Sequence, residues 1–247
     1  MLAEGSCTLN PQKLPCRGAF TFWGEWEPPS EVSVLPQKAK GYPQWLHIPK
    51  LLLGTPPANG QNTDPLVFCD RFRYAICRQF NSNQRRTQLG LLNEGDVILF
   101  GSHIGGRFTL DTVFVVGSYS DWDKNGKLPD GESELHRKIA IEPFRKATTG
   151  CGQSFPSCGL RLYAGATWSS DMPFSFVPCL PSGTRPSGFP RPVIQPTGVL
   201  KSLISPKLKQ NFRVSSVEDA SEVWKVVVKQ VLAQGCALGT AVDEPTR

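Results

Sequence analysis

The stretch from Gly95 to Gly117 constrains the fold of this chain more than any other part of the sequence. Val97–Phe100 is an uninterrupted apolar run, which is typical of a strand buried on both faces. A glycine-rich turn follows, and residues 107–116 then carry the alternating β-branched and aromatic side chains of a second strand. We therefore expect two paired strands. Their polar rim comprises Ser102, His103, Asp111 and Thr112.

The clearest helix is expected near the C-terminus. Ser215 and Glu218 have the spacing of a capping box, and Gly235 can end the helix. Apolar side chains between these points recur with helical spacing, so they should form the face that packs inward. That stripe consists of Ala220, Val223, Trp224, Val227, Val228 and Val231.

Other segments are expected from shorter patterns. Residues 18–26 and 160–168 alternate as strands do, and residues 138–141 predict a short strand. Asp64–Gln79 fits a helix begun by Asp64 and Pro65, although an irregular segment stays open. Residues 84–92 fit a short basic helix leading into the first strand of the pair.

These elements predict one α+β domain over residues 1–247. The sheet should be mixed, mainly antiparallel and partly closed like a barrel, with the C-terminal helix packed on it. The chain has 247 residues with 23 Gly and 22 Pro, which predicts many turns and long ordered loops. We expect the core to span about residues 17–235 and the last residues, from 243 on, to be frayed.

The charge and the cysteines of the chain bear on its binding partners and its cellular location. The formal net charge is +6, which favours a polyanionic partner such as nucleic acid, although ordinary solubility charge explains it as well. None of the eight cysteines forms a C-x-x-C pair, and the N-terminus lacks the pattern of a signal peptide. No apolar run is long enough to span a bilayer. Reduced thiols, a cytoplasmic location and no membrane partner are therefore expected.

The Gly95–Asp96 pair, the strand ending in Phe100 and the strand ending in Val113–Val116 resemble the central strands of PUA-like domains, notably the EVE and ASCH groups. The resemblance covers roughly a tenth of the chain. It implies a small barrel whose pocket takes a nucleotide or a modified base held by aromatic stacking.

Candidate ligand-binding residues follow from that implication. The tryptophans at 23, 26 and 168 each stand beside glycine or polar residues, so they could form the aromatic pocket, although core packing would use tryptophan in the same way. The ligand-binding set is Trp23, Trp26, Ser102, Thr112 and Trp168. The leading function is thus a nucleic-acid- or nucleotide-binding domain that recognises a base.

An enzyme is the alternative function, and the sequence leaves it open. Glu25 and Glu27 lie among tryptophans on one strand face, where burial could raise a carboxyl pKa for acid–base work. A hydrolase or nucleotide-modifying enzyme would use Glu25, Asp111 and His103 together. Asp111 could instead bind backbone amides at a turn or pair with an arginine. A structural or interaction protein, with a broad apolar surface patch, is the third hypothesis.

Two further groups carry possible contacts. A set of arginines with interleaved aromatic side chains could contact phosphates, or form a solvated face. These are Arg71, Arg73, Arg78, Arg85 and Arg86. The 121–132 loop has the oxygen spacing of a calcium loop in Asp121, Asp123, Asn125 and Glu132. A strand precedes it rather than a helix, and Pro129 interrupts it, so we expect no metal and no cofactor.

Overall fold

The computed structural model describes residues 1–26, 28, 30–36, 42–50, 63–123, 128–129, 131–145, 156, 159–183, 188–204 and 217–246. Within these residues the fold is mainly β, with strands in antiparallel pairs and a long C-terminal helix. The expected α+β class, with its mainly antiparallel, barrel-like sheet, is confirmed.

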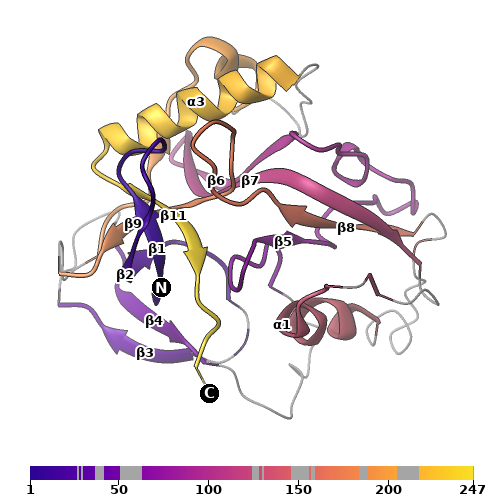
Figure 1. The fold of residues 1–247 in the computed structure, drawn as a ribbon, viewed down its shortest axis with the longest axis horizontal. Coiled ribbons are helices and arrows are strands. Elements are labelled where there is room, and N and C mark those ends of the chain that lie inside the picture. The colour runs from indigo at the N-terminus through magenta and orange to yellow at the C-terminus, as the bar shows by residue number, and fades with distance from the viewer. Residues whose placement is uncertain are drawn as a thin grey trace.

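A closed barrel joins the two ends of the chain. Its strand order is β1 (Leu2–Thr8), β11 (Ala237–Val242), β9 (Val177–Pro181) and β2 (Cys16–Phe22). Figure 1 shows the indigo β1 beside the yellow β11, so the first and last strands meet. Because the barrel needs strands from both ends and from the middle, it forms only when distant parts of the sequence come together.

A second sheet holds the strand pair expected from Gly95–Gly117. Its order is β10 (Val193–Ile194), β7 (Arg107–Trp122), β8 (Leu160–Gly165) and β5 (Arg73–Tyr74), and β6 (Val97–Ile104) also pairs with β7. A separate hairpin, β3 (Ser30–Val34) with β4 (Trp45–Pro49), lies below the barrel in Figure 1.

Helix α3 (Val217–Ala233) covers the junction between the barrel and the second sheet (Figure 1). Its expected apolar stripe is buried, and it packs against Leu110 of β7 and Leu238 of β11. Gly235, at φ +77°, follows the helix end as expected. Ser215, the expected cap, lies outside the described residues.

Short helical segments complete the described elements. The 3₁₀ turns are η1 (Gln88–Gly90) and η3 (Gly198–Ser202). The single turn α1 (Glu134–His136) continues into a π-helical segment, η2 (Arg137–Ile141). The short strand expected at residues 138–141 is therefore wrong. Ser133 caps this turn through the His136 N–H, and the apolar side chains of η2 are buried in two parts of the core, Ile139 in one and Ala140 with Ile141 in the other.

The helix considered for Asp64–Gln79 does not form, and the irregular alternative is correct. Asp64 accepts hydrogen bonds from the backbone N–H groups of Ala75, Ile76 and Cys77, at 2.9, 2.7 and 2.6 Å. Those amides lie more than ten residues away, so the carboxylate fixes a loop that folds back on itself instead of capping a following helix turn.

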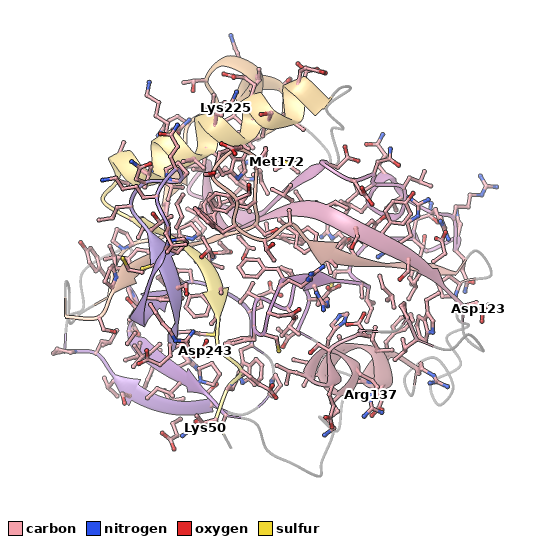
Figure 2. All side chains as sticks on the ribbon, viewed as in Figure 1. Lys50, Asp123, Arg137, Met172, Lys225 and Asp243 are labelled. Carbon is pink, nitrogen blue, oxygen red and sulfur yellow. The ribbon has the colours of Figure 1, made fainter. Side chains whose placement is uncertain are left out.

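The barrel strands at the two ends reach beyond the expected core of residues 17–235. Val242 and Leu238 are fully buried, and Val242 lies in the same core cluster as Phe20 of β2. Asp243, labelled in Figure 2, also pairs with Arg17 and donates its backbone N–H to the Glu4 carbonyl oxygen. The residues around 243 are thus bound to the barrel where fraying was expected.

Candidate functional site

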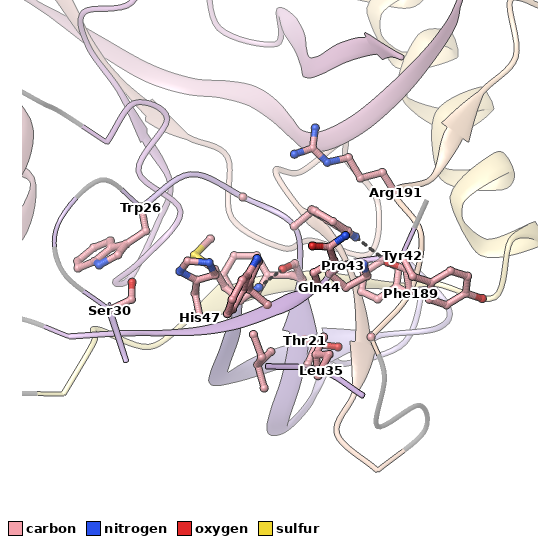
Figure 3. A pocket seen from close by; sticks show the side chains of 17 residues that line it. Thr21, Trp26, Ser30, Leu35, Tyr42, Pro43, Gln44, His47, Phe189 and Arg191 are labelled. Atoms are coloured by element: carbon pink, nitrogen blue, oxygen red, sulfur yellow. Dashed lines mark hydrogen bonds between the residues drawn. The ribbon is translucent and has the colours of Figure 1, made fainter. Parts of the chain in front are cut away.

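A cavity of about 500 Å³ opens between the end of β2, the β3–β4 hairpin and the segment around Phe189 (Figure 3). Its volume lies within the usual range of small-molecule sites. Six of the described lining residues are aromatic. They are Phe22, Trp23, Trp26, Tyr42, Trp45 and Phe189.

The first tryptophan is held by its own hydrogen bond. Trp23 follows β2 directly, and its Nε1–H donates to the Phe189 carbonyl oxygen at 2.9 Å. That bond joins the chain after β2 to the segment 188–191 on the opposite wall. Trp26 packs edge-on against Phe68, with ring centroids 5.0 Å apart, so both rings have fixed orientations.

The outer wall comes from the hairpin. Trp45 and His47 lie on β4, and Trp45 remains 52% exposed at the cavity rim. Gly188 completes the far side at φ +73°, where a Cβ would lie 2.8 Å from the Pro43 ring. Only glycine combines that backbone conformation with that close approach.

Arg191 connects the cavity to carboxylates behind it. Its guanidinium carbon lies 4.7 Å from the centroid of the Trp23 ring, within the range of a cation–π contact. Its Nε lies 3.3 Å from Asp111 Oδ1. Pro190 and Pro192 flank Arg191 and restrict its backbone, and Pro192 accepts a hydrogen bond from Leu110 of β7.

Asp111 occupies a β-bulge in β7. Phe100 pairs with Thr112 and Gly101 pairs with Leu110, so Asp111 is the extra residue between two pairs. Bulges redirect side chains and occur often beside functional sites. Here the bulge places the carboxylate beside Arg191.

Burial changes the proton affinity of this carboxylate. Loss of hydration raises the pKa of Asp111 to about 6; the Arg191 guanidinium opposes the rise, and the Glu25 carboxylate adds to it. Among the described residues, Asp111 Oδ1 accepts no hydrogen bond, so its contact with Arg191 is an ion pair without hydrogen-bond alignment.

Glu25 belongs to the same electrostatic cluster. Glu25 is an exposed residue, yet partial loss of hydration raises the pKa of its carboxyl group. The charge of Asp64 adds to the rise, and that of Arg191 opposes it. The structure therefore places Trp23 and Asp111 against Arg191, and Glu25, the third residue singled out in the sequence, acts on this pair through its charge. Glu27 lies outside the described residues.

His103 does not join Glu25 and Asp111. It pairs across the hairpin with Phe108, which lies three residues before Asp111 on β7, about 10 Å away at the usual strand rise. The His103 Nε2 lies 3.0 Å from the Ile204 carbonyl oxygen. Its side chain lines a smaller cavity of about 190 Å³ beside α3.

Three expected ligand-binding residues lie away from the large cavity. Trp168 donates its Nε1–H to the Pro11 carbonyl at 3.1 Å and packs against the core beneath α3. Thr112 is buried within β7. Ser102 is exposed on β6, where its carbonyl accepts a hydrogen bond from Thr109.

The expected basic group does not lie on one helix. Arg73 is buried and pairs with Glu132, Arg86 pairs with Asp121, and Arg71 pairs with Asp70. Arg78 and Arg85 are exposed on the irregular chain after β5. The helix that would have placed these arginines on one face does not form, and the paired arginines among them have different partners.

The calcium-loop residues have other partners. Asp121 is paired with Arg86 and Arg161, whereas Glu132 Oε1 lies 2.8 Å from His136 Nδ1 and 3.2 Å from Arg73 Nε. Asp123 ends the described part of the loop, and Asn125 lies outside it. Within the described ranges, no group of three His, Cys, Asp or Glu side chains could hold a metal ion.

Sequence reasoning missed Arg191, Tyr42, Trp45 and His47. The alternation Trp45–Leu46–His47–Ile48 was a usable strand signal. For Arg191 the usable signal was an arginine between two prolines, a side chain on a stiff backbone.

The comparisons with known proteins add no assignment: no family model, no curated protein and no solved structure matches this chain. In the part of the chain that the structure describes, no helix has both the length and the apolar character needed to cross a membrane.

Proposed function

We propose that this chain binds a nucleobase, carried by a nucleotide or by an unpaired stretch of nucleic acid, in the cavity between β2 and β4. The observation that supports this most is the aromatic lining, in which Trp23, Trp26 and Trp45 border one space. Stacking of a base on an aromatic side chain contributes roughly 1–3 kcal/mol, and three tryptophans offer more than one such surface.

Position and charge agree with this proposal. Trp45 stands exposed at the rim, where an entering base would meet it first. Arg191 adds hydrogen-bond donors to a lining that is otherwise mostly apolar, the usual composition of a specific small-ligand site. The formal net charge of +6 favours a polyanion that carries the base.

The test is a titration followed by tryptophan fluorescence and calorimetry. Nucleosides, nucleoside monophosphates and short single-stranded RNA and DNA are compared at low and at physiological salt. We expect Trp45→Ala to weaken binding by about tenfold through lost stacking. Trp168→Phe, the matched control outside the cavity, should leave affinity unchanged. Absence of binding to every one of these ligands at low salt would overturn the proposal.

A second candidate is acid–base chemistry on a bound nucleotide, performed by Glu25 and Asp111 without His103. The observation that favours it is an Asp111 carboxyl with a pKa of about 6 beside an arginine, since such a group exchanges protons near neutral pH. Chromatographic assay of nucleotides incubated with the protein, and with Asp111→Asn as control, tests it. Product that forms equally with both proteins would exclude Asp111 from the reaction.

A further inference from the structure

Arg191 uses only part of its guanidinium within the protein. Its Nε lies 3.3 Å from Asp111 Oδ1, and its guanidinium carbon lies over the Trp23 ring. Among the described residues, no hydrogen bond or ion pair occupies its two terminal nitrogens, and its side chain is 30% exposed where it lines the cavity. Figure 3 shows Arg191 among the residues that line the cavity, and the end of its guanidinium keeps N–H donors that no described residue accepts.

Those donors are held in place from three directions. The flanking prolines stiffen the backbone, the bulge holds Asp111 against Nε, and the Trp23 ring contacts the guanidinium through a cation–π interaction. Trp23 is itself fixed by its bond to Phe189. A side chain with so little remaining freedom loses little entropy when it binds, so it is suited to recognition.

The local charge decides which acceptor fits. The carboxylate of Asp111 forms an ion pair with Arg191, and the charge of Glu25 raises the pKa of Asp111. A doubly charged phosphate at the guanidinium would be repelled by these negative carboxylates, whereas the neutral edge of a base carries no net charge for them to repel. Two adjacent neutral acceptors are therefore the better complement to the free end of Arg191.

We propose that Arg191 makes the cavity selective for guanine, by donating end-on to the O6 and N7 acceptors of the base. This inference rests on the proposed base-binding function. Guanine presents these two acceptors side by side, adenine replaces one with an amino donor, and the pyrimidines lack the pair. Asp111 acts as a positioning residue that orients Arg191 through Nε.

The first experiment uses the unmodified protein and an analogue series. Guanosine and inosine, which share O6 and N7, should bind alike. Adenosine and 7-deazaguanosine, which lack one acceptor, should bind about five- to a hundred-fold more weakly. Equal affinity for all four nucleosides would overturn guanine selectivity and leave the base-binding function standing. Binding of none would overturn both.

The second experiment assigns the selectivity to the residues. Arg191→Lys keeps the charge and removes the planar pair of donors, so the preference for guanosine over adenosine should fall to about twofold or less. Asp111→Asn should reduce the same preference while adenosine affinity changes little. Arg17→Lys is the matched control, because Arg17 forms a similar ion pair with Asp243 on the barrel. A preference for guanosine that survives Arg191→Lys would contradict the assignment.

Discussion

The Arg191 side chain lines the aromatic cavity and also contacts the Asp111 carboxylate. The guanidinium rests on Trp23 and faces Asp111, so a change in the charge of Asp111 alters what holds Arg191. Loss of hydration has the larger effect on that carboxylate, because its pKa lies above the ordinary value in spite of the arginine. The ionised form of Asp111 therefore destabilises the folded chain.

The destabilisation by ionised Asp111 predicts how the free energy of unfolding varies with pH. Folding raises the pKa of Asp111 from the ordinary value of 3.8 to about 6, so between these values the folded chain binds more protons than the unfolded chain. Stability from this group is then present at low pH and is lost as pH rises through about 6, by roughly 2–3 kcal/mol in total. Urea unfolding of Asp111→Asn should lack this component. A difference between the two proteins that stays constant with pH would contradict the prediction.

Cys7 offers a second prediction for one residue. A hydrogen bond with Cys179 lowers the pKa of the Cys7 thiol to about 7, although partial burial opposes the change. About half of Cys7 should then be thiolate near neutral pH, and its alkylation rate should rise with a midpoint near 7. Cys179→Ala should move that midpoint upward. The exposed Cys16, followed by mass spectrometry in the same sample, reports access of the reagent.

At the scale of elements, the patterns that sequence carries best are local. The β6–β7 pair and α3 were predicted because their apolar periodicity extends over many residues. The segment from Asp64 to Cys77 could not be predicted with the same certainty, because its shape depends on three distant backbone N–H groups that all donate to the Asp64 carboxylate. Strand β5 has two residues and is fixed by its pairing with β8 and by the bridge between Arg73 and Leu66, which no local pattern indicates.

The bulge in β7 depends on a glycine in the facing strand. A Cβ added to Gly101 would overlap the Thr109 carbonyl oxygen and lie 2.8 Å from the Phe108 ring. Gly101→Ala should therefore destabilise the chain by about 1–3 kcal/mol. Gly18 on β2 has no atom within 4 Å of an added Cβ, so Gly18→Ala is the matched control and should change stability little. Equal thermal midpoints for both variants would show that the hairpin accommodates the methyl group.

At the scale of the whole molecule, the site depends on contacts between distant parts of the sequence. Trp23 was predicted as a ligand residue, but Arg191, its partner, lies far along the chain. The barrel has the same origin, because β1 and β11 stand at opposite ends of the sequence. Short strands such as these carry weak patterns of their own and are fixed by their neighbours. Single residues of the site were therefore predictable, whereas their arrangement was not.

The loop after Asp64 contacts both sheets, so removing the carboxylate that holds this loop should destabilise the whole molecule. Cys69 donates its backbone N–H to Val242 of the barrel, and Phe72 accepts one from Gly165 of the second sheet. Asp64→Ala would leave the N–H groups of Ala75 and Ile76 buried without an acceptor, at a cost of about 2–5 kcal/mol. Chemical denaturation should show that loss, and base binding should weaken in proportion to the unfolded fraction. Asp171→Ala, an exposed control, should change neither. An Asp64→Ala protein as stable as the unmodified chain would show that water replaces the carboxylate at these amides.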